Sequence, residues 1–165
     1  MSRSAGPVEP LDARAARVAA LNALARRDYS SEDLRLKLIE KGYDASVVQP
    51  LLDALRGEKL LDDRRFLENF VVYHAARGQG PLRIRVELRR HGLQGPLVEE
   101  YLNAYPDWIT LLKKARLKKF GAKPATNYAA RQLQARFLGY RGFTSAQIRM
   151  ALGFDVELDS DTEEI

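Results

Sequence analysis

The chain contains no cysteine, and its 165 residues include two histidines and one tryptophan. The absence of cysteine excludes disulfide bonds, thiolate metal sites and cysteine nucleophiles, and it is typical of proteins from a reducing compartment. The two histidines are His74 and His91, and neither belongs to a cluster of His and carboxylate residues with metal-ligand spacing. We therefore expect neither a metal nor a cofactor.

Long apolar runs and alternating patterns are also missing from the sequence. No segment approaches the roughly 18 consecutive apolar residues that a membrane span requires, and residues 1–10 lack the apolar centre of a signal peptide. No segment alternates between apolar and polar residues in the way that indicates a strand. With helical spacing present almost everywhere else, the sequence predicts an all-α protein that acts in the cytoplasm without a membrane.

Three triplets recur at intervals of 50 residues: Lys41-Gly42-Tyr43, His91-Gly92-Leu93 and Arg141-Gly142-Phe143. The apolar positions around them keep one register, because leucine stands four residues before each glycine and Val or Ile stands six residues after it. Each glycine follows a short predicted helix, which favours a left-handed helix end. The basic residue before the glycine suits the negative end of the helix dipole. The pattern predicts one unit used three times.

Each unit consists of three predicted helices joined by short turns, and three such units predict an elongated, curved array. The predicted parts are a flexible N-terminus (1–10), three-helix repeats (11–60, 61–105 and 106–153) and an acidic C-terminal tail (154–165). In the first helix, expected over 11–27, the residues Val18, Leu21 and Leu24 lie at helical spacing. Two pairs, Ser30 with Asp33 and Thr144 with Gln147, have the spacing of a capping box.

The net charge of +5 is distributed unevenly along the chain. Residues 1–62 hold ten basic and ten acidic side chains, whereas residues 107–142 hold nine basic side chains and one acidic side chain. Residues 153–165 carry six acids and no base. A basic body of this kind favours phosphate-rich or acidic partners.

Three predicted helices hold the candidate partner-binding cations. The arginines of the helix that begins at Pro81 lie opposite the apolar residues Ile84 and Leu88. The helix after Asp107 carries five cations within seven positions, and at about 100° per residue these cannot share one direction. A charge run is also typical of a solvated face, which is the alternative interpretation. The candidates are Arg83, Arg85, Arg89, Lys113, Lys114, Lys118, Lys119, Arg131 and Arg136.

The sequence contains no arrangement that indicates catalysis. His74 follows Phe70 by about one helical turn, which favours packing over a role as a base, and Asp62-Asp63 is typical of a helix N-terminus. The segment Gly78-Gln79-Gly80-Pro81 lacks both the preceding strand and the lysine-serine ending of a nucleotide-binding loop. These features predict a binding protein and not an enzyme.

Three segments, taken together and in order, resemble the RecX regulatory proteins: Tyr29 to Leu38, Leu60 to Phe66, and Gly78 to Leu88. The resemblance covers residues from about 15 to 153. It implies tandem three-helix repeats and a partner, the RecA recombinase filament, whose strand-exchange, ATPase and coprotease activities RecX proteins restrain. The third repeat departs from the first two, because Gln134 occupies the position of Leu34 and Ile84.

Two hypotheses about function follow. In the first, a monomeric basic array lies along the groove of the RecA-DNA filament, bridges several subunits and inhibits RecA. In the second, the same basic face tracks the phosphates of single- or double-stranded DNA and affects RecA by competing for DNA. Weak binding to bare DNA favours the first hypothesis, whereas tight, salt-sensitive binding to bare single strands favours the second.

Overall fold

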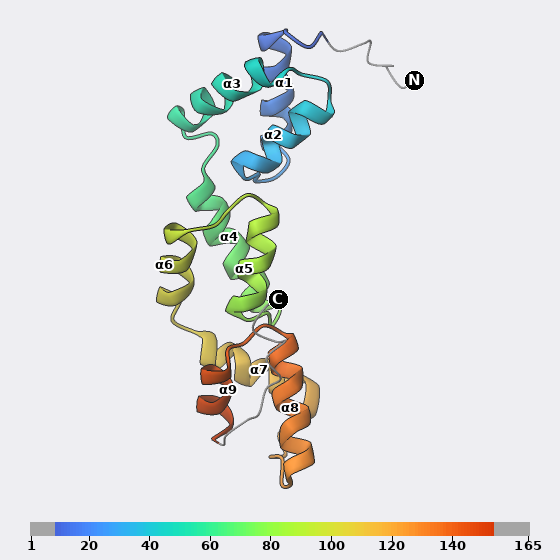
Figure 1. Ribbon diagram of the computed structural model, residues 1–165, viewed down its shortest axis with the longest axis vertical. Coiled ribbons are helices and arrows are strands. Elements are labelled where there is room, and N and C mark those ends of the chain that lie inside the picture. The colour runs from blue at the N-terminus through green and yellow to red at the C-terminus, as the bar shows by residue number, and fades with distance from the viewer. Residues whose placement is uncertain (1–8, 154–165) are drawn as a thin grey trace, which may run out of the picture. The chain divides into compact units, whose positions relative to one another are not determined.

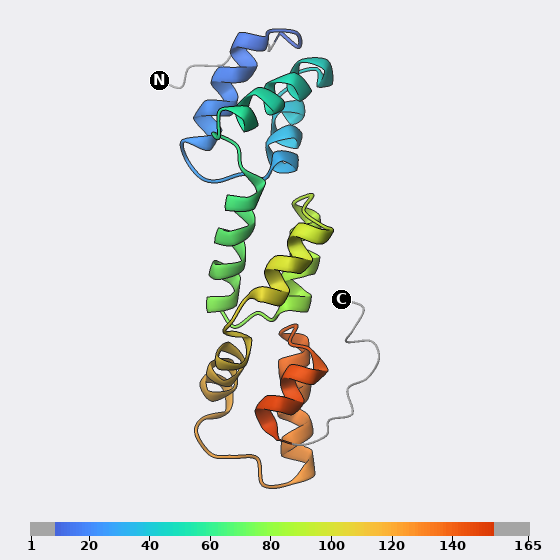
Figure 2. The same cartoon turned by 90° about the vertical axis from the view of Figure 1, so that its left-hand side faces the viewer.

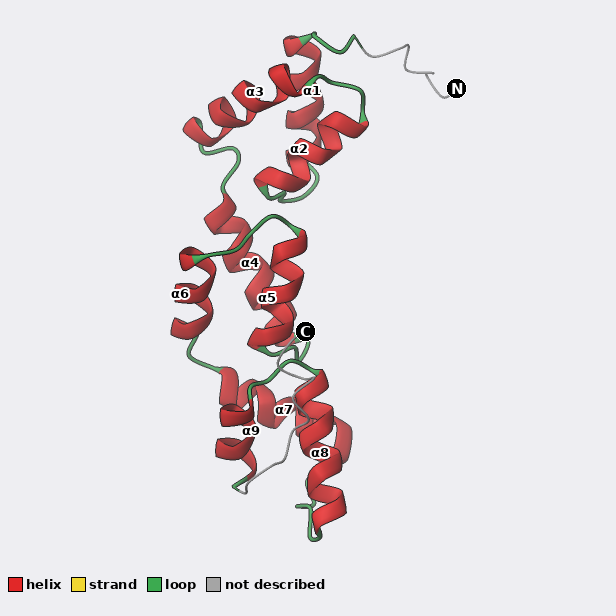
Figure 3. Cartoon of the chain, in the orientation of Figure 1, coloured by secondary structure: helices red, strands yellow, loops and turns green. Residues whose placement is uncertain are grey.

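The structure is a computed structural model that describes residues 9–153, and residues 1–8 and the predicted tail at 154–165 lie outside the described residues. Over residues 9–153 the chain forms helices and no strand (Figure 3). The helices, in chain order, are α1 (Ala13–Leu24), α2 (Ser31–Glu40), α3 (Ala45–Gly57), α4 (Asp63–Ala76), α5 (Pro81–Arg90), α6 (Pro96–Ala104), α7 (Trp108–Phe120), α8 (Tyr128–Tyr140) and α9 (Ser145–Leu152). The predicted all-α class with three helices per repeat is confirmed, and the elongated, curved arrangement stays a prediction.

The described chain divides into two compact units. The first unit extends to Phe66 and includes His91–Leu93, and the second comprises Leu67–Arg90 and continues from Gln94. Within the first unit, α1, α2 and α3 contact one another, and within the second, α7, α8 and α9 do the same (Figures 1 and 2). None of the described helices is long and apolar enough to cross a membrane.

Alanines form the buried face of α1 in the first unit. Ala16, Ala20 and Ala23 are buried at helical spacing, whereas Val18 is 58% exposed. Of the three residues noted at helical spacing in the sequence, Val18 lies outside this buried face, and Leu21 and Leu24 pack only partly buried against the core. Small side chains let α1 approach its neighbours closely, so the larger residues lie at the edges of the contact. The rest of this core comprises Tyr29, Leu34, Leu38, Tyr43, Val48, Leu51, Leu52, Leu55 and Leu61.

The N-terminus of α2 is held by side chains from other parts of the first unit. The buried Ser30 hydroxyl accepts a hydrogen bond from the Asp33 backbone N–H (3.0 Å) and donates one to the His91 carbonyl oxygen (2.7 Å). The Asp33 carboxylate lies 2.8 Å from His91 Nδ1, and the Asp63 carboxylate accepts from the Ser31 backbone N–H at 2.6 Å. The capping box predicted at Ser30 is thus half formed, because Asp33 faces His91. The box predicted at Thr144 is complete.

The N-terminus of α5 is held in the second unit by backbone carbonyls. Gly80 N–H donates to the Arg141 carbonyl (2.7 Å), and Leu82 N–H donates to the Gly142 carbonyl (2.9 Å). A Cβ atom on Gly80 would overlap the Gly142 carbonyl group, and one on Gly142 would overlap Arg83. Gly80 therefore lets the two backbones approach closely. The Gly142 turn occupies the place beside Gly80 where a phosphate would bind, so the Gly78–Pro81 segment is not a phosphate loop.

The two junctions occupy the same place in the repeat. His91 and Arg141 lie 50 residues apart, as do the helix-capping residues Ser30 and Gly80 that they contact. The first N–H groups of a helix have no partner inside that helix, so a buried helix start needs acceptors from elsewhere. In the second unit the turn after α8 supplies two carbonyls to N–H groups at the start of α5. In the first unit the His91 carbonyl accepts from the Ser30 hydroxyl, and the N–H groups of Ser31 and Asp33 donate to Asp63 and Ser30.

We predict that Gly142→Ala destabilises the chain by about 2–4 kcal/mol, because a left-handed residue with a side chain costs roughly 1 kcal/mol and overlap with Arg83 adds about 1–3 kcal/mol. Gly153→Ala is the matched control, since Gly153 also ends a helix at positive φ but a Cβ there would meet nothing within 4 Å. We expect this control to cost about 1 kcal/mol. Urea unfolding followed by circular dichroism measures both, and equal losses would contradict the close backbone contact.

We also predict that Ser30→Ala costs about 2–3 kcal/mol, because it removes a helix cap and leaves the His91 carbonyl without its hydroxyl donor. Thr144→Ala, which removes a cap of similar geometry at a partly buried site, should cost about 1 kcal/mol. The comparison uses the same unfolding measurement. A Ser30→Ala loss no larger than that of Thr144→Ala would show that the bond to His91 contributes nothing.

Candidate partner-binding site

Helix α7 carries four exposed lysines, Lys113, Lys114, Lys118 and Lys119. None of them pairs with a carboxylate among residues 9–153. Buried Trp108 and Leu112 fix the inner face of the helix. The lysines point in several directions from the remaining surface, as the helical period requires.

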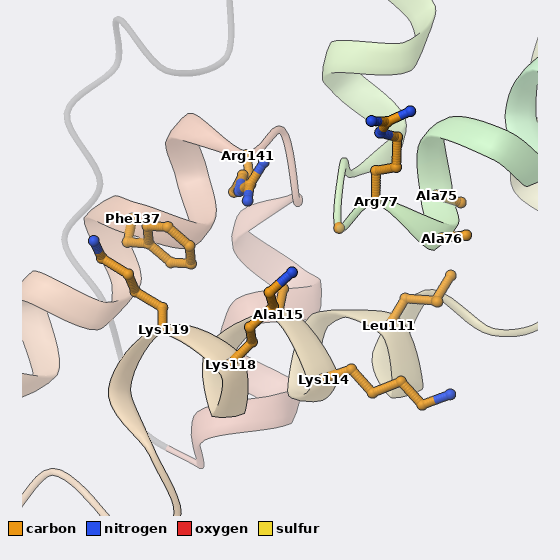
Figure 4. Close-up of a pocket in the computed structure, with 11 residues that line it drawn as sticks. Ala75, Ala76, Arg77, Leu111, Lys114, Ala115, Lys118, Lys119, Phe137 and Arg141 are labelled. Carbon is orange, nitrogen blue, oxygen red and sulfur yellow. The ribbon is translucent and has the colours of Figure 1, made fainter.

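A hollow of roughly 350 Å³ lies in the second unit between the end of α4, one side of α7 and the end of α8. We call it the Phe137 hollow. Its residues are Ala75, Ala76, Arg77, Gly78, Leu111, Lys114, Ala115, Lys118, Lys119, Phe137 and Arg141. Five of these are cations, and none of the described residues that line the hollow is acidic. In Figure 4 the Lys118 side chain rises from α7 between Arg141 and the turn at Arg77.

Aromatic rings position three of these cations. The guanidinium of Arg141 lies 5.5 Å from the centre of the Phe137 ring, and Lys119 Nζ lies 6.0 Å from the same ring. The guanidinium of Arg77 lies 4.7 Å from the centre of the Tyr73 ring. A ring attracts a cation without neutralising it, so these groups keep their charge and their N–H donors for a partner. The hollow is therefore suited to an anionic group.

A second hollow, of roughly 530 Å³, lies on another side of α7 and is named here the Leu117 hollow. It is lined by Lys113, Arg116, Leu117, Pro124, Ala125, Arg131, Gln134, Ala151 and Leu152. Arg116 is committed to the fold, since its Nε donates to Gln134 Oε1 (2.9 Å) and its Nη2 donates to the Lys123 carbonyl (2.7 Å). Leu117 is 51% exposed, so the hollow combines apolar surface with positive charge.

Two of the three predicted arginines of α5, Arg83 and Arg85, are engaged with carboxylates. Arg83 Nε donates to Glu87 at 3.1 Å, and Arg85 makes two bonds to Glu99 on α6 at 2.7 and 2.8 Å. Arg85 and exposed Arg89 line a further hollow at the start of α6. Arg131 lines the Leu117 hollow, and Arg136 is exposed on α8 without lining any of these three hollows. The nine predicted residues thus lie in several places, and their contact with a partner stays a prediction.

His74, the other histidine, belongs to a packed cluster in the second unit. Its ring stacks on Phe70 with ring centres 4.1 Å apart, and its Nδ1 lies 2.7 Å from Gln79 Oε1. Its side chain is 21% exposed. Trp108 is also part of the core, with its indole N–H bonded to the Leu102 carbonyl at 2.8 Å. Tyr128 and Tyr140 are exposed.

Comparison with known proteins identifies the repeats. The family descriptions "RecX, first three-helix domain", "RecX, second three-helix domain" and "RecX, third three-helix domain" match residues 16–55, 62–102 and 107–152. The chain belongs to the RecX family. A regulatory protein RecX of Halorhodospira halophila is 43% identical over 138 residues, which is 83% of this chain and 86% of that protein. A regulatory protein RecX of Pseudomonas entomophila is 36% identical over 144 residues, which is 86% of this chain and 93% of that protein.

Solved RecX structures have the same fold. A crystal structure of regulatory protein RecX matches with a TM-score of 0.73 at 25% identity and covers 86% of this chain and 72% of its own. The crystal structure of RecX from Lactobacillus salivarius matches with a TM-score of 0.73 at 20% identity, and the match covers 86% of this chain and 95% of that chain. The resemblance to RecX found in the sequence is confirmed.

Two cations of the Phe137 hollow, Arg77 and Arg141, are missing from the sequence-based candidates. Both precede a glycine that ends a helix, where a basic residue already suits the helix dipole. Their sequence context therefore gave no separate signal of binding. The 50-residue repeat could have indicated them only together with the contact between the Gly142 turn and Gly80, because that contact brings Arg141 close to the turn that contains Arg77.

We predict that Arg116→Ala destabilises the third repeat by about 1–3 kcal/mol, because it leaves the buried Gln134 side chain and the Lys123 carbonyl without their donor. Lys113→Ala on the same helix should change the stability by less than about 0.5 kcal/mol, since Lys113 is exposed. Thermal unfolding of both variants checks the difference. Equal stabilities would mean that Arg116 acts as a surface cation and has no structural role.

Proposed function

We propose that this chain regulates the RecA recombinase by binding the RecA filament formed on DNA and inhibiting its recombinase, ATPase and coprotease activities. The observation that carries the proposal is the Phe137 hollow, in which five cations converge without an acid among its described lining residues. The family to which the chain belongs supports a regulatory role. The proposal does not require a catalytic group.

The Phe137 hollow supports binding to a polymer that displays negative charge. Several cations at one place raise the local concentration of an anionic partner and speed its association, and both effects weaken as salt rises. The hollow has the volume of a small ligand site and accommodates a phosphate group or a pair of carboxylates. A filament of RecA on DNA offers both kinds of group along its groove, and repeated contacts favour the filament over a free subunit.

A second candidate function is direct DNA binding, in which the chain acts by competing with RecA for DNA. Exposed Lys118 and Lys119, with Arg141 nearby, are equally suited to phosphates of bare DNA. The two functions differ in what is bound. Direct DNA binding requires tight binding to bare single strands with a steep dependence on salt, whereas filament binding requires a preference for the assembled filament.

We predict that Lys118→Glu with Lys119→Glu raises the concentration needed for half-maximal inhibition of RecA ATPase by about tenfold or more, because two attractive charges become repulsive. The matched control is Arg14→Glu with Arg26→Glu, which makes the same change in net charge at exposed positions of the first unit. We expect the control to stay within about twofold of the unchanged chain. Circular dichroism should show the same helix content in all three.

Fluorescence anisotropy with labelled single-stranded DNA, bare or coated with RecA, separates the two functions. Binding to the coated strand at concentrations that leave the bare strand unbound supports regulation through the filament. Equal binding to both forms, with loss in the lysine variant, supports competition for DNA. Unchanged inhibition by the lysine variant would remove the Phe137 hollow from either function.

A further inference from the structure

The Leu117 hollow combines apolar and cationic side chains, and the proposed function assigns no partner to it. Its floor is apolar, with Leu117, Pro124, Ala125, Ala151 and Leu152, and its cations Lys113 and Arg131 are exposed. Leu117 is half exposed beside these cations. The third repeat therefore presents an apolar surface with positive charge beside it, a combination that fits a peptide carrying both apolar and acidic side chains.

The chain itself contains such a peptide. Residues 154–159 read Phe-Asp-Val-Glu-Leu-Asp, so three apolar residues alternate with three acids, and three further acids follow by residue 164. In an extended segment successive side chains point to opposite sides. One side of this segment would be apolar and the other negatively charged, which matches the floor and the cations of the Leu117 hollow.

The connection to the hollow is direct. Leu152, the last residue of α9, lines the hollow, and Gly153 ends α9 in the left-handed conformation. The tail therefore starts at the hollow. Because an extended chain spans about 3.3 Å per residue, residues 154–159 cover roughly 20 Å, which is enough to cross a hollow of this volume.

We propose that the acidic tail of this chain, residues 154–165, docks in the Leu117 hollow, with Phe154, Val156 and Leu158 against the apolar floor and its carboxylates toward Lys113 and Arg131. Docking covers exposed Leu117 and offsets part of the positive charge of α7. The tail then acts as an internal competitor that reduces non-specific attraction to polyanions. This contact forms within the free chain and does not rest on the proposed function.

A spin-label experiment on the full-length chain tests the docking. Because the sequence has no cysteine, Ser160→Cys provides a single attachment point for a nitroxide. We expect the label to broaden the amide resonance of Leu117 at least twofold more strongly than in the same labelled chain that also carries Lys113→Glu and Arg131→Glu. Both substituted residues are exposed, so the helix content should not change. Because Arg131 Nε also donates to the Ala125 carbonyl at 3.4 Å, the comparison between the two chains is made at Leu117.

The control chain separates docking from nearness along the sequence, since a free tail attached to Gly153 also visits this side of α9. Equal broadening with and without the two substitutions would overturn the proposal. Strongest broadening at Gly78 and Ala115 would place the tail in the Phe137 hollow and would also overturn it. Broadening that increases with protein concentration would indicate a second copy as the occupant and would overturn docking within one chain. A further variant, Phe154→Ser with Val156→Ser, should reduce the broadening at Leu117, because it removes two of the three apolar side chains that contact the floor.

Discussion

The fold depends on one recurring contact, in which a glycine turn packs against the start of a helix from the preceding repeat. At Gly142 the approach is between backbones, since a Cβ at Gly80 or at Gly142 would overlap the other chain segment. At Gly92 a Cβ would overlap the Glu32 side chain on α2. The Arg141 and Gly142 carbonyls accept from N–H groups at the start of α5, and the His91 carbonyl accepts from the Ser30 hydroxyl, so each contact satisfies backbone groups that would otherwise cost free energy.

The same contact places the candidate site. The Arg141 carbonyl accepts from Gly80, and the Arg141 side chain lines the Phe137 hollow opposite the turn that contains Arg77 and Gly78. A Cβ on Gly78 would lie 3.3 Å from Ala115 of α7, so this turn also sits closely on the lysine-bearing helix. The backbone junction therefore brings the lysines of α7 together with the arginines of the turns that follow α4 and α8. The positive charge of the hollow arises from that convergence and not from any one residue.

Local features of the fold were predictable from the sequence, and contacts between distant segments were not. The helix ends at Gly42, Gly92 and Gly142 and the cap at Thr144 follow from residues within a few positions of each other. The buried face of α1 was not predictable, because alanine and leucine spacings compete in that helix and only the neighbouring helices select Ala16 and Ala20. Arg85 could not be separated from a free cation, since its partner Glu99 lies on another helix.

The third repeat shows how a polar substitution in a core changes a surface. Burying a leucine or isoleucine stabilises a fold by about 1.5–3 kcal/mol, whereas a hydrogen bond to a buried amide contributes about 1 kcal/mol. Gln134 at this position therefore gives up stability that Leu34 and Ile84 provide, and it holds Arg116 at the inner side of α7. Arg116 in turn fixes the Lys123 carbonyl and thus the segment between α7 and α8. The held segment contributes Pro124 and Ala125 to the Leu117 hollow, so cations of α7 line hollows on two sides of the helix.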